Sequence, residues 1–107
     1  MRKILIDDNP ELKAIDNNLN LEDIDVAKTC EAGIKMLSEN ERYETLYLDY
    51  QLPDGNGFVI IDWLSDHMDK VPTDIFLVSF GHNASLRPYV EALMATAKRN
   101  NENKQLE

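Results

Sequence analysis

The chain has 107 residues, a length that suits one domain with one hydrophobic core. It carries 20 acidic against 11 basic side chains, a formal net charge of -9, which argues against nucleic acid or an anionic membrane surface as a partner because both require basic surface. The single cysteine excludes an intrachain disulfide, no apolar run approaches the length of a membrane span, and the acidic start MRKILIDD does not fit a signal peptide, so we expect a cytoplasmic protein.

A buried strand and an amphipathic helix are predicted at the start of the chain. Residues 3–6 form a short apolar run, which is typical of a buried parallel strand. Pro10 suits the first turn of a helix, where no backbone donor is lost. The residues that we expect on the buried face of this helix follow at helical spacing: Leu12, Ile15 and Leu19.

The middle of the chain repeats this alternation. Ile24 and Val26 alternate with Asp25 and Ala27, as in a half-exposed edge strand. Apolar positions within residues 32–37 indicate a second short helix. Residues 45–48 form a third apolar run. Residues 52–57, with the sequence LPDGNG, are a dense cluster of turn residues.

The last part of the chain predicts one more helix, strand and helix. Apolar side chains keep helical spacing from residue 57 to residue 68, and residues 75–78 form the most apolar strand. A final amphipathic helix is traced by Leu86, Val90, Leu93 and Ala97. We expect a single domain over residues 1–99 and a polar, frayed tail over residues 100–107.

Strands that alternate with helices predict an α/β fold with a parallel sheet. The carboxyl ends of parallel strands open on one edge of the sheet, so polar residues at those ends should meet there. Asp7 and Asp8 follow the first strand, Asp49 the third and Ser79 the fourth. Carboxylates of this kind hold Mg²⁺, and a metal-assisted aspartate can attack a phosphoryl group. A lone aspartate at a strand end is more often a cap or turn residue, so the joint occurrence carries the interpretation.

Three segments resemble the receiver domain of two-component response regulators: ILIDD at residues 4–8, LDYQLPDGNG at residues 48–57 and LVS at residues 77–79. The resemblance, which spans about residues 2–80, implies a flavodoxin-like open parallel sheet of four strands in the order 2-1-3-4, with helices on both faces. It implies Asp7, Asp8 and Asp49 as Mg²⁺ ligands together with the Gln51 backbone carbonyl. It further implies Asp49 as phosphoacceptor and Ser79 as the switch hydroxyl.

The end of the sequence departs from that family. No Lys-Pro pair follows Ser79, so we expect the fifth strand and the family's phosphate-neutralising lysine to be missing. The nearby cationic candidates are His82, Arg87, Lys98 and Arg99, of which Arg87 is the best placed. Phe80 stands where receivers usually carry a small residue, and its ring is expected to hinder access to the pocket.

A second resemblance fits this ending better. Compact receivers thought to process cyclic phosphates also lack the fifth strand, and they share the Asp-Asp start, the Leu-Asp third strand and a Ser-plus-Asn segment, here residues 79–83. Their pattern has histidines where this chain has Tyr50 and Val78. His82 is a candidate general acid or base, although a rim histidine is more often polar surface.

Three functions stay open at this point. The chain is a stand-alone receiver whose Asp49 is phosphorylated and read by a kinase or target, a small metal-dependent phosphoesterase for cyclic phosphates, or a pseudo-receiver that acts by surface contacts alone. The strand at residues 75–78 becomes a sheet edge if no fifth strand follows, and exposed apolar edges are usually covered or paired. We therefore predict that this strand or the helix at residues 85–97 forms a homodimer or docks another protein.

Overall fold

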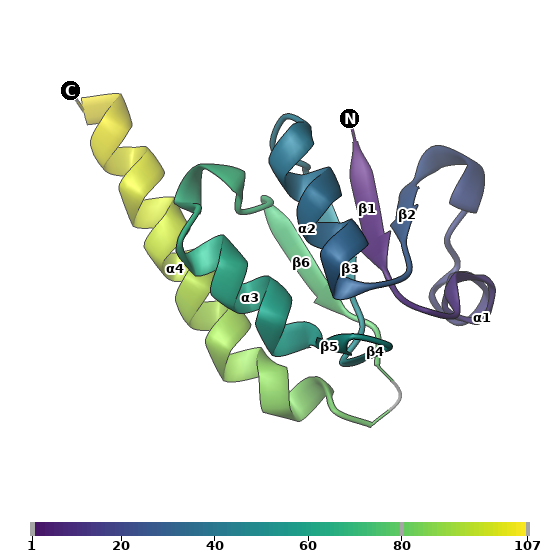
Figure 1. Cartoon of the computed structure of the whole chain (residues 1–107). Helices are drawn as coiled ribbons and strands as arrows, with labels where there is room; N and C mark the ends of the chain where they lie inside the picture. Colours follow the sequence, from purple (N-terminus) through teal and green to yellow (C-terminus); the bar gives the residue numbers. More distant parts are fainter. Residues whose placement is uncertain (1, 80, 107) are drawn as a thin grey trace.

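The computed structural model describes residues 2–79 and 81–106, with side chains described up to residue 100. Four parallel strands form one sheet in the spatial order β2-β1-β3-β6 (Figure 1): β1 Lys3–Ile6, β2 Asp25–Ala27, β3 Thr45–Leu48 and β6 Asp74–Leu77. Because β6 is the fourth strand of this sheet along the chain, the predicted order 2-1-3-4 is confirmed.

Helices flank the sheet, as predicted for this fold. The α-helices are α1 Pro10–Asn17, α2 Cys30–Glu39, α3 Gly57–Ser65 and α4 Asn83–Leu106, and two 3₁₀ turns are η1 Leu21–Asp23 and η2 Met68–Lys70. Helix α4 continues to Leu106, through most of the segment predicted as a tail. The boundary at residue 99 and the fraying of the tail stay predictions.

One face of the sheet holds the main core. Side chains of Ile4, Ile6, Leu46 and Leu48 are fully buried there, because alternate residues of neighbouring strands point to the same side. They pack against apolar side chains of α2, α3 and α4: Leu37, Ile60, Leu64, Leu86, Val90 and Leu93. Each such burial contributes about 1.5–3 kcal/mol, so this face supplies most of the driving force for folding. In Figure 1, α2 and α3 lie in front of the sheet and α4 runs alongside α3.

The other face is covered less completely, and here the predicted face of α1 is wrong. Leu12 is 47% and Ile15 81% exposed, whereas Lys13 and Ala14 are buried. The helix is therefore turned so that a lysine, rather than the apolar residues, faces the sheet. The physical reason is electrostatic, since the Lys13 ammonium group meets buried carboxylates at the end of the sheet.

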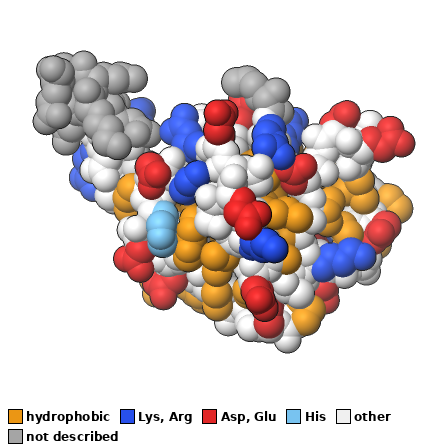
Figure 2. Space-filling view, turned by 45° about the horizontal axis from the view of Figure 1, so that its top comes forward, with side chains coloured by type: hydrophobic (Ala, Val, Ile, Leu, Met, Phe, Trp, Pro, Cys, Tyr) orange, Lys and Arg blue, Asp and Glu red, His pale blue; other side chains and the backbone are white. Residues whose placement is uncertain are grey.

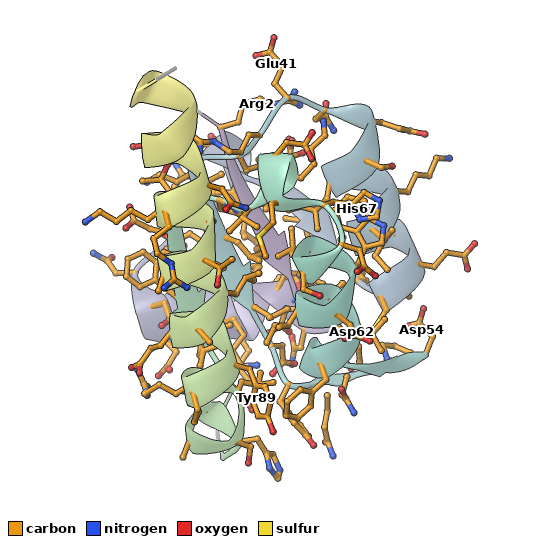
Figure 3. All side chains as sticks on the ribbon, turned by 90° about the vertical axis from the view of Figure 1, so that its left-hand side faces the viewer. Arg2, Glu41, Asp54, Asp62, His67 and Tyr89 are labelled. Carbon is orange, nitrogen blue, oxygen red and sulfur yellow. The ribbon has the colours of Figure 1, made fainter. Side chains whose placement is uncertain are left out.

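The LPDGNG cluster forms a small antiparallel hairpin of β4 Gln51–Leu52 and β5 Gly55–Asn56. Asp54 lies at its outer end (Figure 3) and accepts hydrogen bonds from the backbone N–H groups of Cys30 and Glu31, at 2.7 and 3.0 Å. It thereby caps the first turn of α2 and lowers its own pKa through those bonds. Burial, followed by the nearby Asp54 charge, raises the pKa of Cys30 to about 11, so the thiol stays protonated and structural.

Helix α3 begins where the chain crosses close to the end of β3. The Asn56 side chain accepts a hydrogen bond from the N–H of Phe58 at 2.9 Å, which caps α3. A Cβ added at Gly57 would lie 2.7 Å from Leu86 Cδ1 and 2.9 Å from the Asp49 carbonyl oxygen. Only glycine leaves room for this approach, so Gly57 fixes where α3 starts beside Asp49.

The surface shows no sign of a polyanion-binding patch on the face drawn in Figure 2. Acidic and basic side chains are interspersed there, and the blue side chains of Lys and Arg do not gather in one place. Within the described residues, no helix combines the length and the apolar character needed to cross a membrane.

Candidate metal and phosphoryl site

Three aspartates meet at the carboxyl edge of the sheet. Ile6 and Leu48 are neighbours in the parallel register of β1 and β3, so Asp7, Asp8 and Asp49 leave the two strands at the same level. One carboxylate oxygen from each of the three lies within 4.8 Å of the others. Asp7 is fully buried and Asp49 is 5% exposed, whereas Asp8 is exposed. The predicted convergence of these carboxylates is therefore what the fold produces.

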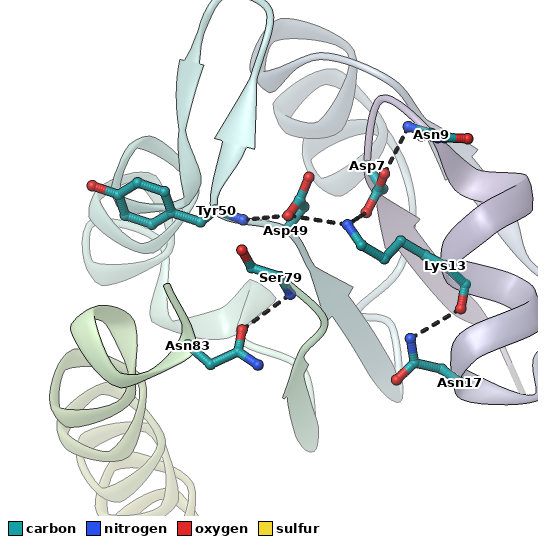
Figure 4. Close-up of polar contacts among 8 residues, drawn as sticks. All are labelled: Asp7, Asn9, Lys13, Asn17, Asp49, Tyr50, Ser79 and Asn83. Carbon is teal, nitrogen blue, oxygen red and sulfur yellow. Dashed lines mark hydrogen bonds and ion pairs between the residues drawn. The ribbon is translucent and has the colours of Figure 1, made fainter. Parts of the chain in front are cut away.

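A lysine that the sequence analysis did not select lies between the two buried carboxylates. Lys13 Nζ is 2.8 Å from Asp7 Oδ2 and 3.3 Å from Asp49 Oδ1 (Figure 4), and its side chain is only 5% exposed. Pro10 starts α1 directly after the rim, so Lys13 stands one turn into the helix. At that position its side chain reaches back over the end of β1.

Burial and neighbouring charges shift the pKa values of Asp49 and Lys13. Burial and the neighbouring Asp7 charge raise the pKa of Asp49, against the opposing effects of Lys13 and of the Tyr50 N–H that donates to Asp49 Oδ1 at 2.8 Å. Burial lowers the pKa of Lys13, but the hydrogen bond to Asp7 and the charges of Asp49 and Asp7 together outweigh it, so its pKa is raised. Lys13 therefore stays cationic at neutral pH.

The fourth strand brings Ser79 to the same rim. The N–H of Val78 donates to the Leu48 carbonyl at 3.0 Å, and the N–H of Ser79 donates to Asn83 Oδ1 at 3.0 Å (Figure 4), which ties the strand end to the first turn of α4. A hollow of about 360 Å³ opens here. Its lining includes five of the predicted site residues, Asp8, Asp49, Gln51, Ser79 and His82, together with Lys13 and Gly81, which were not predicted. Such a volume holds a phosphoryl group with its surrounding waters.

His82 stands at the wall of this pocket. Its ring stacks on Tyr50 with 4.5 Å between ring centroids, so this aromatic neighbour orients the imidazole. Arg87 lies elsewhere: it lines a separate groove of about 640 Å³ along β6 and α4. Phe80, predicted to hinder the pocket, lies outside the described residues.

The signal that pointed to Lys13 was present in the sequence. A proline one residue after the acidic rim fixes the first turn of a helix, and a lysine one turn later must lie near that rim. The helical spacing of Leu12, Ile15 and Leu19 indicated a different buried face of α1, so Lys13 was not selected as a site residue. The structure places Lys13 where the sequence analysis sought a cation among His82, Arg87, Lys98 and Arg99.

The donor set fits a hard divalent cation. Three carboxylates converge within 4.8 Å, and the exposed Asp8 and the pocket beside Gln51 leave a wet side where waters complete a coordination shell. Mg²⁺ usually binds through one or two carboxylates and keeps several waters. A partly open cluster of carboxylates therefore suits Mg²⁺ better than a fully enclosed site. The acidic cluster is thus able to hold a metal ion.

Comparisons with known proteins agree with this fold. The MaeR response regulator bound to beryllium trifluoride superposes with a TM-score of 0.60 at 24% identity, covering 88% of this chain and 78% of that one. The signal receiver domain of a putative Luxo repressor protein from Vibrio parahaemolyticus superposes with a TM-score of 0.54 at 19% identity, covering 94% of each chain. No curated protein matches the sequence significantly. The family described as Cyclic-phosphate processing Receiver domain matches residues 2–95. The chain therefore belongs to this family of receiver domains.

Proposed function

We propose that this receiver domain binds Mg²⁺ at Asp7, Asp8, Asp49 and the Gln51 backbone carbonyl, and that Asp49 accepts a phosphoryl group. The observation that carries the proposal is the convergence of three carboxylates within 4.8 Å at the rim of an open pocket. The protein partner is a kinase that supplies the phosphoryl group or a downstream target that recognises the phosphorylated domain. Either partner would bind this domain through direct protein contacts.

The proposed transfer uses groups already at the rim. A carboxylate oxygen of Asp49 attacks the phosphorus of an acyl phosphate, a new O–P bond forms, and the P–O bond to the acyl group breaks as the carboxylate leaves with the electron pair. Mg²⁺, when bound, offsets the negative charge that otherwise separates the carboxylate from the phosphoryl donor. The Ser79 hydroxyl, which lines the same pocket, donates a hydrogen bond to a phosphoryl oxygen.

Intact-mass measurement tests this assignment. Incubation with acetyl phosphate and Mg²⁺ should add one phosphoryl group to the wild-type chain and none to Asp49→Asn. Asp62→Asn is the matched control, because Asp62 is an exposed aspartate on α3 that does not line the pocket and should leave the addition unchanged. Absence of any addition, or an addition that persists in Asp49→Asn, contradicts the proposal.

Hydrolysis of a cyclic phosphate is a second candidate, favoured by the matched family and by His82 at the pocket wall. In that reaction a water oxygen attacks phosphorus and gives its proton to Asp49. The P–O bond to the ring oxygen breaks, and protonated His82 donates a proton to that oxygen. Turnover of cyclic nucleotides should then vanish in Asp49→Asn and fall in His82→Gln. Turnover that both variants retain rejects this function.

The partner-binding part of the proposal concerns the groove along β6. Tyr47 and Phe76 stack at 5.5 Å on its floor, and Phe76 is half exposed. Arg87 and Glu91, four residues apart on α4, line the same groove. A two-fold axis through this groove would set Arg87 of one copy opposite Glu91 of the other, so the charges of the two surfaces would complement each other. We propose that a second copy of this chain occupies the groove.

The third reading, a pseudo-receiver that acts by surface contacts alone, predicts no response to metal. A thermal melt with and without Mg²⁺ separates it from both other functions. A rise in the melting temperature that disappears in Asp49→Asn supports a metal-dependent site. An unchanged melting temperature favours the pseudo-receiver.

A further inference from the structure

The pocket contains a cation that arrives from an unexpected element. Lys13 comes from α1, whereas the cationic candidates sought in the sequence all follow β6. We propose that Lys13 changes partners: it neutralises Asp7 and Asp49 in the metal-free pocket and turns to a phosphoryl oxygen once a divalent cation binds. The inference rests on the proposed function, since it assigns the group that receives the phosphoryl charge.

Position and burial support this assignment. The Lys13 side chain is 5% exposed, its Nζ atom lies 2.8 Å from Asp7 Oδ2, and the same side chain lines the pocket with Ser79 and Gln51. It is the one Lys or Arg side chain among the described residues that line this pocket. A phosphoryl group on Asp49 would therefore form beside it, since Lys13 Nζ is already 3.3 Å from Asp49 Oδ1.

The balance of charge explains why both a lysine and a metal fit one site. Asp7, Asp8 and Asp49 bring three negative charges when ionised, and Lys13 brings one positive charge. The remainder of two negative charges is what one divalent cation neutralises. Lys13 and the metal are therefore complementary in total charge, although they compete for the same oxygens of Asp7 and Asp49.

The side chain is built for such an exchange. A lysine ammonium is a compact charge on a flexible four-carbon stem, so its nitrogen can move while the helix that carries it stays in place. The start of α1 has a second tie to the rim besides the ammonium group, because the N–H of Asn9, next to its N-terminal proline, donates to Asp7 Oδ1 at 2.7 Å. The Asn17 side chain also donates to the Lys13 carbonyl at 2.9 Å, which holds the Lys13 backbone.

The first arm of the test measures Mg²⁺ binding without any phosphoryl donor. Lys13→Met is compared with wild type and with Lys35→Met, which removes one lysine charge at an exposed position of α2. In EDTA, Lys13→Met should have a lower melting temperature than wild type, as measured by Trp63 fluorescence. It should also bind Mg²⁺ about tenfold more tightly than wild type, because a competing cation is gone. Equal Mg²⁺ affinity in all three proteins overturns the proposal that Lys13 competes with Mg²⁺ for the carboxylates.

The second arm measures uptake of beryllium fluoride in saturating Mg²⁺ by ¹⁹F NMR. Lys13→Met should bind this phosphoryl mimic about a hundredfold more weakly than wild type, the scale of losing one charged contact to a transferring group. Lys13→Arg, which keeps the charge, should lose far less, and saturating Mg²⁺ keeps the Met variant folded by supplying positive charge. Equal uptake by wild type and Lys13→Met overturns the role of Lys13 alone. No uptake by wild type overturns the proposed function together with it.

Discussion

The two sides of the acidic pocket are built differently. On the β1 and β3 side, Asp7, Lys13 and Asp49 are at least 95% buried and bonded to one another or to backbone N–H groups. On the β6 side, Ser79 is half-buried and His82 is exposed against Tyr50. The fold fixes the charges that we propose bind metal and phosphate, whereas Ser79 and His82, which would meet the substrate, lie at the more exposed side of the pocket. The buried charges are therefore held in place, whereas the accessible groups lie on the other side of the same pocket.

The largest expected difference between the two sides is in stability. Asp7→Ala leaves the buried Lys13 with one carboxylate partner fewer and should lower the free energy of unfolding by about 3–5 kcal/mol, as breaking a buried ion pair does. Ser79→Ala on the other side should change it by less than about 0.5 kcal/mol. Urea denaturation in EDTA measures both. Similar losses in the two variants contradict the contrast.

Two glycines test the same contrast through the backbone. Gly57→Ala brings a Cβ to 2.9 Å from the Asp49 carbonyl oxygen and 2.7 Å from Leu86 Cδ1, so it should lower the free energy of unfolding by about 1–3 kcal/mol. A Cβ at Gly81, on the β6 side, meets nothing within 4 Å, so Gly81→Ala should stay within about 0.5 kcal/mol of wild type. Equal effects of both substitutions in thermal or urea unfolding speak against a rigid β3 side.

A smaller effect is expected in the groove along β6, where the open side of the molecule meets its proposed partner. Phe76→Glu puts a charge on the groove floor and should weaken self-association by at least about tenfold, or 1.4 kcal/mol. Ile15→Glu is the control, because Ile15 is 81% exposed and does not line the groove. Light scattering across a concentration series measures both. A wild-type chain that stays monomeric throughout rejects the dimer.

The smallest effect concerns Asp54, which holds the hairpin against α2. Hydrogen bonds from the N–H groups of Glu31 and Cys30 lower the pKa of Asp54, so its contribution to stability is present above the unfolded value of 3.8 and is lost as pH falls through the lower folded value. Asp54→Asn should therefore be less stable than wild type at neutral pH, and the difference should shrink below pH 3.8. The urea midpoints of both proteins, measured at neutral pH and below pH 3.8, test this prediction. A stability difference that grows in acid contradicts the capping role of Asp54.

The sheet and its rim were predictable because β1 and β3 are short apolar runs followed directly by aspartates, and the apolar run of β6 continues through Val78 to Ser79. The carboxyl ends of parallel strands lie at one edge of the sheet, which is enough to bring together the residues that follow them: Asp7, Asp8, Asp49 and Ser79. The orientation of α1 was not predictable from hydrophobic spacing, since the attraction of Lys13 to two buried carboxylates turned the helix away from its apolar face. The capping of α2 by Asp54 was likewise hidden, because it joins residues 24 apart in the sequence.

A crystal structure with Mg²⁺ and beryllium fluoride bound would test the central claim most directly. The account predicts the metal among the carboxylates of Asp7, Asp8 and Asp49, the beryllium on an Asp49 oxygen, and Lys13 Nζ within hydrogen-bond distance of a fluorine. An empty acidic cluster, or a bound mimic with Lys13 still paired to Asp7 and Asp49, would contradict it.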